Sequence, residues 1–162
     1  MPRIYKTVRL AYETKKWLND LIAHHEEQLK VIKESLITEY EDKLRKNEKF
    51  KNYSPTLSIT VSSGSILEEA YKYCKELELS SSDWSAISEE CKKTAKEEIK
   101  ENGDLDVGSI TPRFLIGTDI LEGLEQLQWE LKPANMQRNL QLNFVIKLVV
   151  FNYYQHEVLN KR

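Results

Sequence analysis

The stretch Ile4-Tyr5-Lys6-Thr7-Val8-Arg9-Leu10 stands near the start of the chain and alternates apolar with polar side chains, apart from Lys6. Alternation at every second residue is typical of a β-strand with one buried face. Directly after it, apolar residues recur at steps of three and four from Tyr12 to Lys46, with no glycine or proline between them. The order predicts a short strand followed by one long amphipathic helix.

A second strand and helix follow in the same order near the other end of the chain. Residues 110–116 again alternate, and an amphipathic helix is expected from Ile120 to Leu131, where Pro133 ends it. Displacing this half by 106 residues places Phe114 on Val8 and aligns the apolar positions of the following helices. We therefore expect an internal repeat. Pro112 cannot donate to a ladder, so we expect it to face away from its partner strand.

Three further helices are expected, over residues 66–77, 84–101 and 140–159, and residues 57–61 form a short strand or an extended connection. Only five glycines and four prolines interrupt the chain, which favours a mainly helical fold. The last helix is apolar on most of its circumference and belongs in the middle of a core. The expected shared core consists of Leu18, Leu21, Ile66, Ala70, Leu124, Leu127, Val145, Ile146 and Val149.

Charge is unevenly distributed along the chain. The net charge is −2, but residues 1–16 are basic and residues 83–106 are acidic. The N-terminus lacks the apolar core of a signal peptide, and no stretch is long enough to span a bilayer. Cys74 and Cys91 lie far apart without a CxxC partner, so reduced thiols are expected. These features predict a cytoplasmic protein without a membrane partner.

Motifs for chemistry are missing from the sequence. It contains no glycine-rich phosphate loop and no evident set of nucleophile, base and acid. We therefore expect no enzyme activity, no catalytic residue, no cofactor and no metal. The run His24-His25-Glu26-Glu27 has metal-binding residue types, but adjacent histidines on a helix point in different directions. A solvated polar face is the preferred interpretation.

Four short segments carry a resemblance to a known family. Residues 6–11 and 13–21 combine an alternating strand with an amphipathic helix, and residues 109–131 repeat this order. Residues 64–71 and 143–150 look like a second helix of the same unit. In this order the segments resemble the ribbon-helix-helix family of DNA-binding proteins. About thirty extra residues, 24–55, separate the first two helices, which departs from the family pattern.

The resemblance implies a mainly α fold with two diverged units in one chain. Residues 1–78 would form the first unit with an extended first helix, 79–108 a linker helix, and 109–162 the second unit, all around one core. The two strands would pair as a short two-stranded antiparallel ribbon, giving a tandem pseudo-dimer. Leu29, Ile32, Leu36 and Ile37 of the extended first helix need a partner and are expected to pack on the linker helix.

The resemblance also implies a DNA-binding surface in the major groove. With Val8, Leu10, Phe114 and Ile116 facing inward, the base-facing residues would be Tyr5, Thr7, Arg9, Thr111, Arg113 and Leu115. Arg9 and Arg113 would each donate two hydrogen bonds to a guanine; the alternative is that they are ordinary solvent-facing residues. Phosphate contacts would come from Lys6, Lys15 and the start of the second helix at Ser62, Ser63, Gly64 and Ser65.

The expected function is sequence-specific binding of double-stranded DNA, as a transcriptional repressor or as a plasmid or phage accessory protein. The alternative is a helical protein-interaction module, an inhibitor or adaptor that does not bind DNA. In that case the long first helix would be the docking surface, for another protein or for a homo-oligomer.

Overall fold

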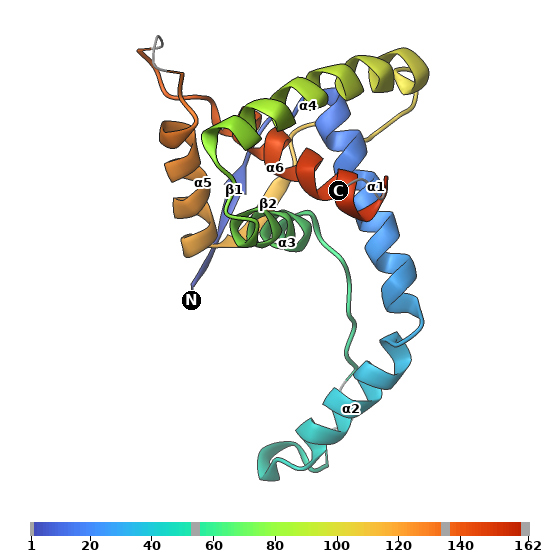
Figure 1. The fold of residues 1–162 in the computed structure, drawn as a ribbon. Coiled ribbons are helices and arrows are strands. Elements are labelled where there is room, and N and C mark those ends of the chain that lie inside the picture. The colour runs from blue at the N-terminus through green and yellow to red at the C-terminus, as the bar shows by residue number, and fades with distance from the viewer. Residues whose placement is uncertain (1, 53–55, 134–136, 160–162) are drawn as a thin grey trace.

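The computed structural model describes residues 2–52, 56–133 and 137–159 (Figure 1). Within these residues the chain is mainly helical and has one two-stranded antiparallel sheet, which confirms the expected fold class at this level. In chain order the elements are β1 (Arg3–Thr7), α1 (Tyr12–Lys30), α2 (Lys33–Arg45), a 3-10 turn (Glu48–Phe50), α3 (Ser63–Glu76), α4 (Ser81–Asn102), β2 (Arg113–Gly117), α5 (Thr118–Glu130) and α6 (Leu142–Glu157).

The predicted strands pair with each other although more than a hundred residues separate them. Arg3 lies opposite Gly117, and Thr7 lies opposite Arg113. Pairing continues past the strand ends, where the N–H of Leu10 donates to the carbonyl of Ile110 at 2.7 Å. The expected antiparallel ribbon is therefore present, and it spans nearly all of the two segments.

Pro112 does not turn away from the partner strand, so that expectation was wrong. It lies opposite Val8, and its carbonyl accepts a hydrogen bond from the Val8 N–H at 3.3 Å. Only the bond that a proline cannot donate is missing from the ladder. Regular pairing is interrupted at this point, which is why β2 begins at Arg113 instead of at the expected Ile110.

One hydrophobic core is shared by β2 and by every described helix except α2 and the 3-10 turn. The central helix is α6, which packs against α1, α3, α4 and α5, as its apolar circumference predicted. Leu127 is partly buried at the edge of this core. The other expected core residues are buried in it: Leu18, Leu21, Ile66, Ala70, Leu124, Val145, Ile146 and Val149.

Serine caps begin α3 and α4. The Ser62 hydroxyl accepts from the N–H of Ser65, and the Ser80 hydroxyl accepts from the N–H of Asp83. Both caps are reciprocal, which satisfies two N–H groups at each helix start. Despite the apolar surface of α6, none of the helices in the described ranges is long and apolar enough to cross a membrane.

The long helix expected from Tyr12 to Lys46 is broken into α1 and α2. The break falls at Val31 and Ile32, two consecutive β-branched residues that lower helix propensity. Nothing packs there to offset this preference, because Val31 is 86% exposed. The periodicity continued through the break, so the apolar pattern alone did not reveal it.

The helix α2 projects away from the core and does not pack on α4 (Figure 1). The expectation that the extension covers the linker helix was therefore wrong. Instead, α4 packs on α6 and on the beginning of α1, where Lys16 faces Glu98 at 3.5 Å. Residues 57–61 return to the core as an extended connection without a strand. Residues 53–55 of the insertion lie outside the described part of the chain.

Candidate nucleic-acid interface

The two faces of the ribbon differ in burial. On one face Val8, Leu10, Phe114 and Ile116 are all buried, as expected. On the other face Tyr5, Thr7, Arg9, Thr111 and Arg113 are exposed. The alternation read in the sequence therefore separates a packed face from a solvent-exposed one.

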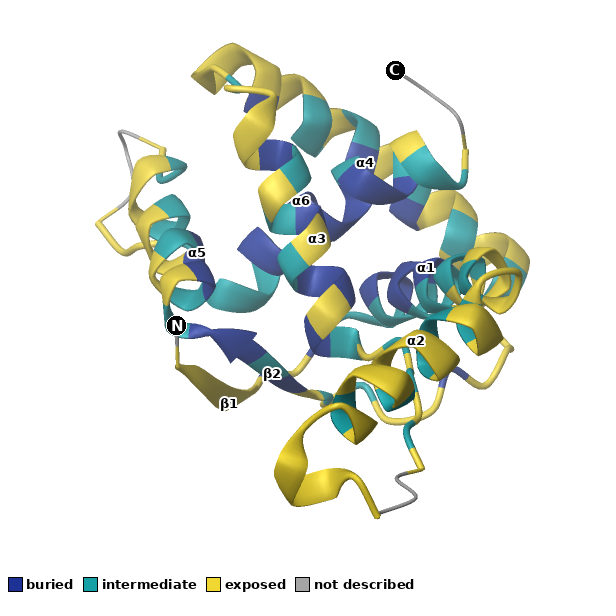
Figure 2. Ribbon diagram, turned by 90° about the horizontal axis from the view of Figure 1, so that it is seen from below, coloured by how far each residue is buried: buried dark blue, intermediate teal, exposed yellow. Residues whose placement is uncertain are grey.

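The two strands are unequally covered. Every residue of β1 is exposed, whereas β2 contributes Phe114 and Ile116 to the core, and Figure 2 shows β1 on the outside of β2. Lys6 lies opposite Phe114 on the inward side and is still exposed, because β1 packs on β2 and not on the helices. The basic side chain of Lys6 is therefore accessible from solvent.

Arg113 stacks on Tyr5 across the ribbon. The guanidinium carbon lies 3.8 Å from the centre of the Tyr5 ring, which is a cation–π contact between diagonal positions of the two strands. Tyr5 is itself 57% exposed. A guanidinium that stacks on a ring keeps its in-plane N–H donors available for a ligand.

Positive charge gathers at the ribbon. Arg3 faces the Glu68 carboxylate of α3 at 3.6 Å. Among the described residues, Lys6, Arg9 and Arg113 form no ion pair within the chain. Their charge is therefore uncompensated by close contacts and is available to an anionic partner.

The first turn of α3 covers the outer edge of β2. Hydrogen bonds of the ladder join the even-numbered residues, so the N–H and C=O of Leu115 point away from β1. A Cβ added to Gly64 would lie 2.3 Å from the Leu115 oxygen, so only glycine allows this approach. Leu115 is consequently half-buried, unlike the other residues expected to face bases.

The residues expected to contact phosphate are only partly free to do so. Ser62 and Ser65 use their hydroxyls and N–H groups in the capping box of α3. Gly64 is buried against β2, and Ser63 is half-buried beside it. Lys15 donates to the side-chain oxygen of Asn19 at 2.8 Å, and partial burial lowers the pKa of its ammonium group.

Two residues that hold the ribbon in place were missed by sequence reasoning. The hydroxyl of Tyr12 donates to the carbonyls of Asn102 and Leu105, and the amide of Asn19 donates to the carbonyl of Val107 at 3.0 Å. These bonds tie α1 to the connection that leads into β2. Their acceptors are backbone groups 88 to 93 residues away, so no local pattern could reveal them.

His24 and His25 do not form the solvated polar face that the sequence suggested. Both are half-buried against α6, where His24 faces the Glu157 carboxylate at 3.6 Å and His25 contacts the Tyr153 hydroxyl at 3.0 Å. Across the described ranges no group of three or more histidine, cysteine or acidic residues is arranged to hold a metal ion. The two histidines thus contribute to the packing of α1 on α6.

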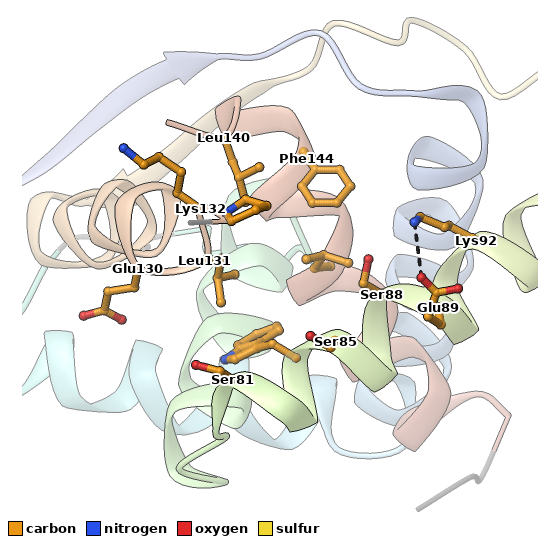
Figure 3. A pocket seen from close by; sticks show the side chains of 13 residues that line it. Ser81, Ser85, Ser88, Glu89, Lys92, Glu130, Leu131, Lys132, Leu140 and Phe144 are labelled. Carbon is orange, nitrogen blue, oxygen red and sulfur yellow. Dashed lines mark hydrogen bonds and ion pairs between the residues drawn. The ribbon is translucent and has the colours of Figure 1, made fainter. Parts of the chain in front are cut away.

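A cleft of about 530 Å³ lies away from the ribbon, between α4 and the facing parts of α5 and α6 (Figure 3). Ser81, Ser85 and Ser88 line its α4 side, at the spacing of one helix face. The opposite side is mainly apolar and includes Leu131, Leu140, Phe144 and Leu148. Hydroxyl groups facing an apolar wall suit binding of an amphipathic group.

No family model matches the chain, and no curated protein or solved structure is significantly similar to it.

Proposed function

We propose that this protein binds double-stranded DNA in a sequence-specific manner through the ribbon formed by β1 and β2. The observation that carries the proposal is the antiparallel pairing of two distant segments, with Tyr5, Thr7, Arg9 and Arg113 exposed together on one face. A two-stranded ribbon fits the major groove, where each base pair presents a distinct pattern of donors and acceptors. Such a protein would act as a repressor or as a plasmid or phage accessory protein.

An internal two-fold relation supports a tandem ribbon-helix-helix interpretation. The 106-residue repeat equates Thr7 with Arg113, and these two residues also lie directly opposite each other in the ribbon. A two-fold axis through this pair would also exchange Val8 with Phe114 and Leu10 with Ile116. Each of these four residues is buried. The repeat in the sequence and the register of the strands thus agree on one centre of symmetry.

Base reading is assigned to Arg9 and Arg113. Continuing the register places Arg9 opposite Thr111, so the two arginines lie diagonally across the ribbon at the same end. Diagonal positions are roughly 7–8 Å apart, which suits contacts to neighbouring base pairs. Each bidentate contact to guanine would contribute ~1–3 kcal/mol of discrimination.

Phosphate binding is assigned to Lys6 and to the first turn of α3. The capping box uses the N–H groups of Ser62 and Ser65, and Gly64 is buried against β2, which leaves the N–H of Ser63 as the donor at this helix start. A helix N-terminus beside the ribbon favours an anion through this donor and through its dipole. Lys15 would join these contacts only after releasing Asn19.

A helical protein-interaction module is the second candidate function, and the projecting α2 favours it. No residue of α2 is fully buried, and Tyr40 is 50% exposed, so much of the helix is accessible to a partner, although Leu36, Ile37 and Leu44 are half-buried. In this case the ribbon would be a structural element without a ligand.

Selection from a pool of random duplex DNA separates the two functions. The proposal predicts an enriched sequence, and the affinity for it should fall steeply as salt concentration rises, because phosphate contacts release counterions. Replacing Lys6 with Ala should weaken all duplexes to a similar extent and flatten this dependence, whereas Lys93→Ala on α4 serves as the charge-matched control. If no duplex is enriched at low salt, sequence-specific DNA binding is ruled out and the interaction module is favoured.

A further inference from the structure

The segment 31–51 forms an arm that extends from the end of α1 and includes α2 and the 3-10 turn (Figures 1 and 2). Large apolar side chains are exposed along it: Val31 is 86% exposed, and Ile32 and Tyr40 are each 50% exposed. A helix of 13 residues has marginal stability in water unless one side is packed against something. The arm thus has exposed apolar side chains, and burying them against a partner would stabilise its helix.

Charge along the arm is divided into two halves of opposite sign. After Lys33, residues 34–42 contain four acidic residues and no basic one: Glu34, Glu39, Glu41 and Asp42. Residues 43–51 contain five basic residues and one acidic: Lys43, Arg45, Lys46, Lys49, Lys51 and Glu48. Within one chain these groups form only exposed pairs, such as Lys43 with Glu39 at 3.5 Å. Exposed pairs of this kind contribute little to stability.

Because an acidic half is followed by a basic half, the arm is complementary in charge to a second arm that runs in the opposite direction. If two arms lie antiparallel, the acidic half of each faces the basic half of the other. Parallel arms would instead place like charges together. Antiparallel contact of identical surfaces is the arrangement that a two-fold axis generates.

We propose that the arm is a dimerisation surface and that its occupant is the arm of a second copy of this chain. Tyr40 supplies an apolar contact near the two-fold axis, and Val31 and Ile32 supply apolar contacts at the outer ends of the paired arms. The two charged halves set the antiparallel direction. The ribbon lies on the body of the molecule, remote from α2 (Figure 1). A dimer joined by its arms therefore carries two exposed ribbons. This inference is independent of DNA binding.

Two charge-reversed variants test the proposal by their mass in sedimentation or light scattering. One variant combines Glu39→Lys with Asp42→Lys, and the other combines Lys46→Glu with Lys49→Glu. The unchanged chain should be a dimer. Each variant alone should be a monomer, because like charges then face each other across the axis. An equimolar mixture of the two should recover the dimer, since the reversed halves complement each other.

Loss of the dimer would not result from misfolding, because none of the four substituted residues is buried. Near-UV circular dichroism should stay unchanged in both variants, and Glu97→Lys on the exposed side of α4 is the control for a charge change elsewhere. The proposal is overturned if the unchanged chain is a monomer, or if each variant still dimerises alone. It is also overturned if mixing the two monomeric variants does not restore the dimer.

Discussion

Replacing Gly64 with Ala should damage the contact between α3 and β2 that supports the ribbon. The added Cβ would lie 2.3 Å from the oxygen of Leu115 and 2.9 Å from its nitrogen. Real Cβ contacts essentially never occur below 3.0 Å, so α3 and β2 would have to move apart. Both obstructing atoms belong to the backbone of a paired strand, which no side-chain rotation can relieve.

The expected cost follows from two opposing contributions. Overpacking of a close contact typically costs ~1–3 kcal/mol, and a backbone obstacle places this site at the upper end. Alanine is the better helix former by ~0.5–1 kcal/mol, which offsets part of that cost. We therefore expect Gly64→Ala to lower the free energy of unfolding by about 2 kcal/mol.

Gly123→Ala is a matched control within α5. Its added Cβ would also meet atoms at very short range, but these are the hydroxyl and two ring carbons at the far end of the half-buried Tyr71 side chain. Rotation of the Tyr71 side chain relieves these contacts, so the change should stay within about 1 kcal/mol of zero. Urea unfolding followed by circular dichroism measures both variants. Equal stability of the two variants would refute the close approach of α3 to β2.

Two further predictions concern buried polar and ionisable groups. Lys147→Met should lower the free energy of unfolding by roughly 3 kcal/mol, because it leaves the Glu13 carboxylate, which is 8% exposed, without its partner. Adding Glu13→Gln should recover much of this loss in denaturant unfolding. If the double variant recovers nothing, the pair does not act as a unit. Burial raises the pKa of the Cys74 thiol to about 11, that of the Cys91 thiol to about 12 and that of the Tyr154 phenol to about 12. These groups ionise first in the unfolded chain, so their stabilisation is complete below about pH 8 and is lost as pH rises toward 11–12. The urea midpoint should therefore fall between about pH 8 and about pH 10.5, and an unchanged midpoint would contradict the burial of these groups.

Local periodicity predicted the ribbon and most of the core. Val8 and Leu10 alternate with polar neighbours in the sequence, and both are buried. The apolar circumference of α6 likewise predicted its central position. In these elements the burial pattern of one segment is decided by its own side chains, so a single sequence contains the information.

Features that depend on distant partners were not predicted. Ile32 continues the helical apolar pattern, yet the helix is interrupted there because no partner covers this side chain. Leu115 alternates correctly for an exposed position, but the first turn of α3 half-covers it through a contact that requires Gly64. Tyr12 and Asn19 reach backbone carbonyls that have no sequence signature. Each of these outcomes depends on tertiary contacts that periodicity does not encode.

The effect of Arg9→Ala and Arg113→Ala on binding to a selected duplex tests the ribbon mechanism most directly. Each change should weaken binding by ~1–3 kcal/mol and relax the preference at a defined base pair. Lys93→Ala, remote from the ribbon on α4, should leave both the affinity and the preference unchanged. If both arginine variants bind the selected duplex as tightly and as selectively as the unchanged chain, the ribbon does not read DNA.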